Sequence, residues 1–216
     1  MLRDLSLELS VCNHFVSEIR DKEVQKDAMR FRRNLERIGE ILGYEISKLM
    51  SYQLKDVQTP LGTAYPMLLE QQPVIVSVLR AGLTIHQGVL NYFDRAENAF
   101  ISAYRKPHAK GEKIEVVVEY IACPSVEGKE IILCDPMLAS GTSLLLAYDA
   151  ILKKGTPSRV HIACGIASAE GVRNLQKNLP ENTSIHCGAI DPELNDMAYI
   201  VPGLGDAGDL AYGEKI

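Results

Sequence analysis

The sequence predicts an α/β protein with a mostly parallel central sheet flanked by helices. After residue 72 the chain alternates between near-continuous apolar segments of strand length and segments with helical spacing. Strands that are apolar along their whole length are typical of a parallel sheet covered on both faces. With 216 residues and no linker, internal repeat or low-complexity tract, we expect a single domain over residues 1–216.

Before that alternation we expect an N-terminal helical extension over about residues 1–50. Apolar residues recur every three to four positions from Lys26 to Leu49, which predicts a helix, whereas residues 1–20 give no clear pattern. Four arginines share the opposite face of this helix: Arg30, Arg32, Arg33 and Arg37. A solvated face is the ordinary interpretation of such a cluster, and an anion site or an oligomer contact is the alternative.

Residues 50–72 hold a turn at Thr59–Gly62 and little else that is regular. Strands are then predicted at 73–79, 99–104, 130–135, 159–167 and 184–190. Helices are predicted at 83–93, 144–154 and 169–179. Residues 114–121 alternate as an antiparallel or edge strand does, and with the cationic segment 105–113 they predict a β-arm around 105–125.

The segment Asp135–Ser143 joins a predicted strand to a predicted helix and is the strongest candidate for a binding site. Backbone N–H groups at the start of a helix suit a bound phosphate, the serine and threonine hydroxyls add donors, and Gly141 lets the backbone approach closely. The Asp135 carboxylate would repel a phosphate but can accept hydrogen bonds from sugar hydroxyl groups. The combination suggests a phosphorylated ribose. A plain strand–helix connection is the alternative, and the P-loop and dinucleotide motifs are absent from the sequence.

Two arginines follow other predicted strands, at the strand ends where parallel sheets bind ligands. Arg80 is either a surface cap or a placed anion ligand, and the Ala81-Gly82 pair after it permits close backbone approach. Arg105 opens a basic loop that, taken alone, is more typical of a solvated, mobile segment. Together the arginines and the loop could clamp a second anion such as pyrophosphate.

Residues 199–209 form a fourth candidate segment. Its one proline and three glycines exclude a helix or a central strand and predict an irregular loop with exposed backbone N–H and C=O groups. Such a loop could read a flat polar ring through main-chain hydrogen bonds. A plain C-terminal turn is the alternative.

Composition narrows the function classes. The net charge of −5 gives no general attraction to nucleic acid. The sequence has no apolar stretch of membrane-spanning length and no signal segment at its N-terminus, so we expect a cytoplasmic protein without nucleic-acid or membrane partners. The five cysteines lack CxxC spacing and the five histidines lack metal spacing, which predicts buried reduced thiols and no zinc-type site.

Four motifs together resemble the uracil phosphoribosyltransferase family, in that family's order and spacing. They are LRAG at 79–82, YR at 104–105, DPMLASGTS at 135–143 and YIVPGLGDAGD at 199–209. The resemblance covers nearly the whole chain and is weakest over the first 25 residues; the last motif is specific to the uracil enzymes. Ser140-Gly141-Thr142 departs from the usual Thr-Gly-Gly, and the N-terminal region lacks the usual His-Pro-Leu-Val pattern.

The resemblance implies the type I phosphoribosyltransferase fold and the transfer of a 5-phosphoribosyl group from 5-phosphoribosyl 1-diphosphate (PRPP) to uracil, giving UMP and diphosphate. It implies catalytic roles for Arg80, Arg105, Asp135 and Asp206. It implies PRPP binding by these four residues and by Pro136, Met137, Leu138, Ala139, Ser140, Gly141, Thr142 and Ser143. It implies uracil binding by Ile200, Gly205, Asp206 and Ala207, within a C-terminal base-binding loop at 199–209.

The resemblance further implies Mg²⁺ as cofactor, held mainly by PRPP with no protein ligand assured, and a homo-oligomer, dimeric or higher. GTP is a candidate effector, for which the Arg30–Arg37 cluster is suggestive. Two alternatives stay open. One is a transferase for another base, such as a 6-oxopurine, which would be expected to place an aromatic residue and a lysine beside the base. The other is an RNA-binding regulator of pyrimidine operons, against which the acidic balance argues.

Overall fold

A seven-stranded sheet forms the centre of the structure, a computed structural model that describes residues 1–105 and 116–214. The strands lie in the order β1-β11-β10-β9-β6-β7-β8, and each neighbouring pair is parallel except β7 and β8. The five long parallel strands are β6 (Val74–Leu79), β7 (Glu97–Arg105), β9 (Glu130–Leu138), β10 (Arg159–Ser168) and β11 (Ser184–Asp191). The predicted mostly parallel sheet is confirmed.

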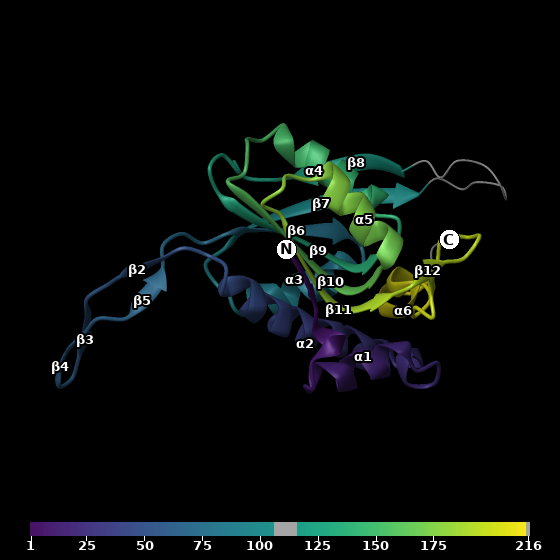
Figure 1. The fold of residues 1–216 in the computed structure, drawn as a ribbon, viewed down its shortest axis with the longest axis horizontal. Coiled ribbons are helices and arrows are strands. Elements are labelled where there is room, and N and C mark those ends of the chain that lie inside the picture. The colour runs from purple at the N-terminus through teal and green to yellow at the C-terminus, as the bar shows by residue number, and fades with distance from the viewer. Residues whose placement is uncertain (106–115, 215–216) are drawn as a thin grey trace.

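Helices cover both faces of this sheet (Figure 1). One face carries α1 (Cys12–Arg20), α2 (Ala28–Ser47) and α3 (Gly82–Leu90), and the other carries α4 (Thr142–Leu152) and α5 (Ala169–Asn178). The side chains between each helical layer and the sheet form two hydrophobic cores, one per face. Burial on both faces explains why the strands are apolar along their whole length.

The helices occupy the predicted segments, with shifted ends. α3 ends at Leu90 rather than at residue 93, because Phe93 is buried from the turn that follows the helix. The predicted helix 144–154 begins earlier, at Thr142, and ends at Leu152. Apolar periodicity places the middle of a helix well and its ends poorly, since a buried turn residue extends the same pattern.

The first residues correct the expectation of a wholly helical extension. Residues 2–4 form β1 (Leu2–Asp4), which adds a parallel strand to β11 at one edge of the sheet. A 3₁₀ turn (Leu5–Leu7) leads to α1, and a second 3₁₀ turn (Val24–Lys26) leads to α2. The extension therefore begins as an edge strand of the central sheet. It then continues into α1 and α2, which cover one face of that sheet.

Residues 50–72 also differ from the prediction, because they are mostly paired strands. β2 (Tyr52–Leu54) pairs with β5 (Met67–Leu69), and β3 (Val57–Thr59) pairs with β4 (Gly62–Ala64), all antiparallel. These strands form a long arm that projects away from the body of the protein (Figure 1). The predicted turn at Thr59–Gly62 lies at the tip of this arm.

The predicted β-arm around 105–125 corresponds to the antiparallel pair of β7 and β8 (Val116–Ala122) at the other edge of the sheet. Its basic loop, with Lys106, Lys110 and Lys113, lies outside the described residues. In the parts of the chain that the structure describes, no helix is long and apolar enough to cross a membrane. All five cysteines are free thiols, and only Cys123 is not fully buried, which confirms the predicted reduced cysteines.

Candidate active site

Three of the predicted segments lie at the C-terminal ends of β6, β7 and β9, on the same side of the sheet. Ser77 in β6 pairs with Cys134 in β9, and Leu79 pairs with Ser102 in β7, so the C-terminal parts of the three strands lie side by side. The backbone of Gly82 passes so close to β9 that a Cβ atom there would lie 2.7 Å from the carbonyl oxygen of Cys134. Arg80, which directly follows β6, and Asp135, which lies within β9, are therefore on neighbouring strands toward the same carboxyl end of the sheet.

The Asp135–Ser143 segment forms a small pocket, but the strand before it is longer than predicted. β9 continues to Leu138 rather than ending at residue 135, because Met137 and Leu138 still pair with β10. The turn into α4 is made by Gly141, whose φ of 81° is in the left-handed region that favours glycine. The first turn of α4 then leaves backbone N–H groups without partners inside the helix.

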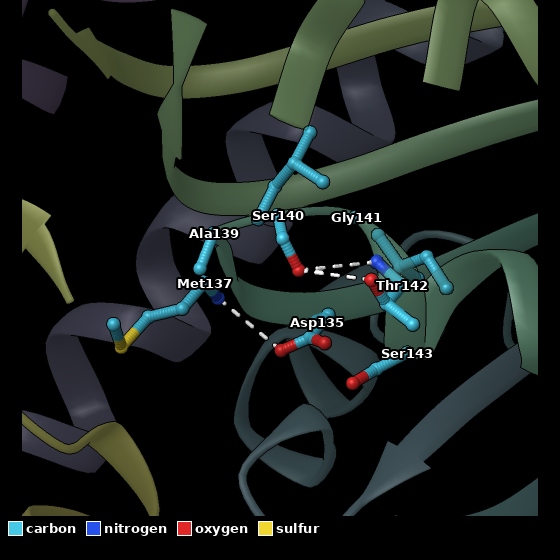
Figure 2. A pocket seen from close by; sticks show the side chains of 9 residues that line it. Asp135, Met137, Ala139, Ser140, Gly141, Thr142 and Ser143 are labelled. Carbon is cyan, nitrogen blue, oxygen red and sulfur yellow. Dashed lines mark hydrogen bonds between the residues drawn. The ribbon is translucent and has the colours of Figure 1, made fainter. Parts of the chain in front are cut away.

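Figure 2 shows the side chains that line this pocket. The Ser140 and Thr142 hydroxyls lie 3.0 Å apart, with the Ser143 hydroxyl and the Asp135 carboxylate beside them. The Asp135 carboxylate accepts a hydrogen bond from the backbone N–H of Met137 at 3.2 Å. The pocket therefore combines donors at a helix N-terminus with one carboxylate at its edge, the arrangement expected for a phosphate next to a sugar.

The pocket is lined by Asp135 and by every residue from Met137 to Leu144, but not by Pro136. Pro136 is buried and has no N–H to donate. Its carbonyl group faces β10, where a Cβ atom on Gly165 would lie 2.9 Å from it. Of the nine loop residues predicted to bind PRPP, Pro136 is thus the one placed outside the pocket.

Helix α5 supports the loop through residues that sequence reasoning missed. The buried Ser168 hydroxyl donates to the carbonyl oxygen of Ala139 at 2.6 Å and accepts from the N–H of Gly171 at 2.8 Å, which caps α5. Asn174 donates to the carbonyl oxygen of Ser140 at 2.7 Å. The only sequence signal was the serine at the start of a predicted helix, a pattern that indicates a cap and not a contact to a distant loop.

Arg80 contacts the C-terminal segment. Its Nη2 lies 3.2 Å from the Asp209 carboxylate and donates to the carbonyl oxygen of Gly213 at 3.1 Å. The side chain is 38% exposed, so its charge is available to a ligand at this edge of the sheet. Arg105 is the last residue of β7, and its side chain lies outside the described residues.

Residues 199–209 are more regular than the predicted loop. The segment starts in β13 (Ile200–Val201), which pairs with β12 (Glu193–Leu194), and it runs into helix α6 (Ala207–Tyr212). Pro202 and the glycines exclude regular structure only between these two elements. The Asp206 carboxylate caps α6 by accepting from the N–H groups of Gly208 and Asp209, at 2.8 and 3.0 Å.

All four arginines of the α2 cluster contact other groups of the chain, and two of them pair with carboxylates. Arg30 forms two hydrogen bonds with Glu18, and Arg33 forms ion pairs with Glu36 and Glu40. The other two arginines act elsewhere: Arg32 donates to the carbonyl oxygen of Ala211, and Arg37 donates to Asn34 and lies over the ring of Phe15. These contacts join α2 to α1 and to α6.

The site offers neither a thiol nucleophile nor a ready-made metal cage. Burial raises the pKa of the Cys134 thiol well above its ordinary value, and the adjacent Asp135 carboxylate raises it further. Cys134 therefore stays protonated and unreactive. No group of three or more histidine, cysteine or acidic side chains comes together over the described ranges, so a cation here would need oxygen ligands from its substrate.

The chain is similar to known proteins over nearly its whole length. A sequence model of the uracil phosphoribosyltransferase family matches residues 7–214. A curated uracil phosphoribosyltransferase of Porphyromonas gingivalis is 51% identical over 212 residues, 98% of each chain, and one of Pyrococcus furiosus is 37% identical over 93% of this chain and 85% of that one. The solved structure of the AQ2163 protein from Aquifex aeolicus superposes with a TM-score of 0.88 at 32% identity, covering both chains fully. The matched span contains all four candidate segments.

Proposed function

The chain belongs to the uracil phosphoribosyltransferase family, and from that membership we propose how its residues divide the work of the transfer. The reaction joins a ring nitrogen of uracil to the ribose carbon of PRPP, breaks the bond from that carbon to diphosphate and releases the proton of that nitrogen, giving UMP and diphosphate. One observation supports this assignment of roles. Arg80, the Asp135 pocket and the C-terminal segment lie together at the C-terminal ends of the parallel strands.

The Asp135–Ser143 pocket is the proposed site of the 5′-phosphate and ribose of PRPP. The N–H groups at the start of α4 and the three hydroxyls beside them would donate to phosphate oxygens. The Asp135 carboxylate would accept from the ribose hydroxyl groups. Its negative charge also favours the cationic, oxocarbenium-like character expected of the ribose in the transition state.

Arg80 and Arg105 are the proposed partners of the diphosphate. Arg80 follows β6, the neighbour of β9 in the sheet, and Arg105 is the last residue of β7, on the other side of β6. A guanidinium group donates to two oxygens at once, which suits a diphosphate and stabilises the negative charge that grows on it as it leaves.

Mg²⁺ is the proposed cofactor. The Asp135 carboxylate at the edge of the pocket offers the oxygen ligand that Mg²⁺ prefers, and PRPP would supply most of the others. When bound, the cation would neutralise negative charge on the diphosphate. Asp206 lies in the C-terminal segment, where its carboxylate caps the N-terminus of α6. Its proposed role toward PRPP depends on that fixed carboxylate.

The backbone of Ile200 and of Gly205–Ala207 is the proposed reader of uracil. Ile200 and Ala207 are buried, so their peptide groups are held in place, and Gly205 has a φ of 92° that favours glycine. Cytosine presents a different donor and acceptor pattern at its edge. Binding it would leave buried backbone groups unpaired, and this is the proposed source of selectivity.

A panel of bases tests the function together with this division. UMP formation is measured with PRPP and Mg²⁺, beside parallel assays with cytosine, hypoxanthine and orotate. Turnover with uracil alone is the expected result. Turnover with hypoxanthine instead would show that residues 199–209 read another base. If no base is used and the protein binds pyrimidine-operon leader RNA in a filter assay, the RNA-binding regulator is favoured.

A homo-oligomer is the proposed assembly, and the projecting arm supports it. The arm exposes large apolar side chains, among them Leu54 at 62%, Leu61 at 99% and Met67 at 57%. A two-stranded hairpin is marginal in water on its own, and exposed apolar patches of this kind are typical of interfaces. A second copy of the chain is the proposed cover. Activation by GTP stays a separate prediction, tested by adding GTP to the base panel.

A further inference from the structure

Arg20 and Asp191 form a bidentate ion pair beside the proposed base-binding segment. The two terminal nitrogens of Arg20, at the end of α1, each lie 2.8 Å from one carboxylate oxygen of Asp191, at the end of β11. The side chains are 21% and 7% exposed, so the pair is largely shielded from water. Charge-assisted hydrogen bonds in this geometry are among the strongest that side chains make.

The same two side chains hold both backbone groups of Gly203. The Asp191 carboxylate accepts from the N–H of Gly203 at 3.0 Å, and Arg20 donates to the carbonyl oxygen of Gly203 at 3.1 Å. Gly203 has a φ of 61°, and a Cβ atom there would lie 2.0 Å from the carbonyl oxygen of Ile200. The chain is therefore fixed at this point in a conformation that only glycine can adopt.

A second contact from the N-terminal extension holds the next residue. With its amide nitrogen turned toward the backbone, Gln25 donates to the carbonyl oxygens of Ile19 and Leu204, at 3.2 and 2.8 Å. Leu204 is itself buried in the hydrophobic core that α1 shares. The segment between β13 and α6 is thus anchored to the region around α1 at two consecutive residues.

We propose that Arg20 and Asp191 are positioning residues for uracil recognition, because they fix the Gly203 peptide and with it the backbone that reads the base. The inference rests on the proposed role of residues 199–209. A reader made of backbone groups has no side chain to adjust, so its selectivity depends on the angle at which each N–H and C=O is held. The N-terminal extension would then serve the base site without touching the base.

The experiment removes the ion pair without leaving a charge unpaired. A single loss of Arg20 would strand a buried carboxylate and could unfold the chain, so the test variant combines Arg20→Met with Asp191→Asn. Steady-state kinetics with uracil and with PRPP should show a KM for uracil raised by about tenfold or more, because small misplacements of a reading group weaken binding steeply. The KM for PRPP should change by less than about twofold, since the pocket at Asp135 is held by α5 and the Asp206 carboxylate is held by its own cap on α6.

Two further variants separate positioning from general damage. Arg20→Lys keeps the charge but has one donor nitrogen in place of the two that contact Asp191, and it should recover part of the affinity for uracil. Glu18→Gln weakens a second bidentate arginine–carboxylate pair, between Glu18 on α1 and Arg30 on α2. That pair makes no contact with residues 199–209 in the described structure, so the substitution should change neither KM. If the two KM values rise together in the double variant, or if neither rises, the proposal is wrong.

A readout that needs no activity distinguishes this inference from the function itself. Hydrogen–deuterium exchange of peptides covering residues 200–206 should be faster in the double variant and unchanged in Glu18→Gln. A wild-type protein that does not use uracil would contradict the proposed reader of the base, whatever the exchange result. Faster exchange with an unchanged KM for uracil would overturn the positioning role alone.

Discussion

Arg80 and Asp209, 129 residues apart in the sequence, meet with 3.2 Å between Nη2 and Oδ1. The contact joins the arginine proposed to bind diphosphate to the last residue of the proposed base-binding segment, in the first turn of α6. Both side chains are more than a third exposed, so the ion pair contributes little to stability. Its importance is that a substrate anion would compete with Asp209 for the same guanidinium.

The first prediction concerns this arginine. Arg80→Ala should lower kcat/KM for PRPP by about 10²-fold or more, because a donor aimed at developing charge is lost. The melting temperature should stay within about 2 °C, since the exposed ion pair is weak. Asp209→Asn keeps Arg80 and should leave kcat/KM within about threefold of the wild type. Equal losses in both variants would mean that the contact, and not the arginine, matters.

Arg105 carries a second prediction. It ends β7 beside the end of β6, so Arg105→Ala should lower turnover by about 10²-fold or more through the same loss of charge stabilisation. Arg95→Ala is the matched control, because Arg95 is exposed and precedes β7 at the opposite end of the strand. An Arg105→Ala enzyme with normal turnover would remove this arginine from the mechanism.

The support of the phosphate pocket by α5 gives a third prediction. Ser168→Ala removes the cap of α5 and the hydrogen bond to Ala139, and should cost about 1–2 kcal/mol in the free energy of unfolding. Because the loop loses an anchor, the KM for PRPP should rise several-fold while the KM for uracil stays constant. Gln176→Ala, at an exposed position of the same helix, serves as the control. A larger effect on uracil than on PRPP would contradict the assignment of this pocket.

These supports show where sequence reasoning stops. The alternation of strands and helices, the parallel sheet and the four motif segments were all visible, because apolar periodicity and glycine placement are local signals. β1 was missed because three residues are too few to show a pattern. The Arg20–Asp191 pair joins residues 171 positions apart, and no local feature marks either one as a partner of Gly203.

The sequence also did not predict the detailed structure of the C-terminal segment or of the arm. Pro202 and the glycines predicted an irregular segment, but α6 begins only four residues after Gly203, with the Asp206 cap. The hairpin pairs of the arm lack the apolar alternation that identifies a strand with one buried face. Without a covered face in this chain, its residues have no reason to alternate, and sequence periodicity cannot find them.

A buried histidine predicts how stability depends on pH. Burial first, and then the neighbouring His161, lower the pKa of His186 from 6.5 to about 4. The unfolded chain therefore binds more protons than the folded one between these values, and the free energy of unfolding should fall as the pH drops from about 6.5 toward 4. The lowering of the His186 pKa from 6.5 to about 4 corresponds to a loss of about 3 kcal/mol in the free energy of unfolding once the pH is below both values.

Urea unfolding at pH 7, 5.5 and 4.5 measures this slope. His186→Gln should be less stable at pH 7, because a buried side chain that donates or accepts a hydrogen bond with Ser184 is replaced, but its pH slope should be shallower. His14→Gln, an exposed histidine on α1, should keep the wild-type slope. A variant at residue 186 with the full slope would assign the acid sensitivity to other groups.

The arm gives the last prediction, which concerns assembly. Leu54 and Leu61 are largely exposed on a pair of short hairpin ladders, and both would be buried if a second copy covered the arm. Changing both to serine should weaken association by about 3 kcal/mol or more, a factor of over about 10² in the dissociation constant. Sedimentation velocity over a concentration series should then show a shift toward monomer. Leu9→Ser, which changes an equally exposed leucine outside the arm, controls for a general loss of apolar surface. Since the arm lies far from the sheet edge that carries the site (Figure 1), the KM for PRPP should not follow the assembly state; an oligomer that survives the double change would mean that the arm is not the interface.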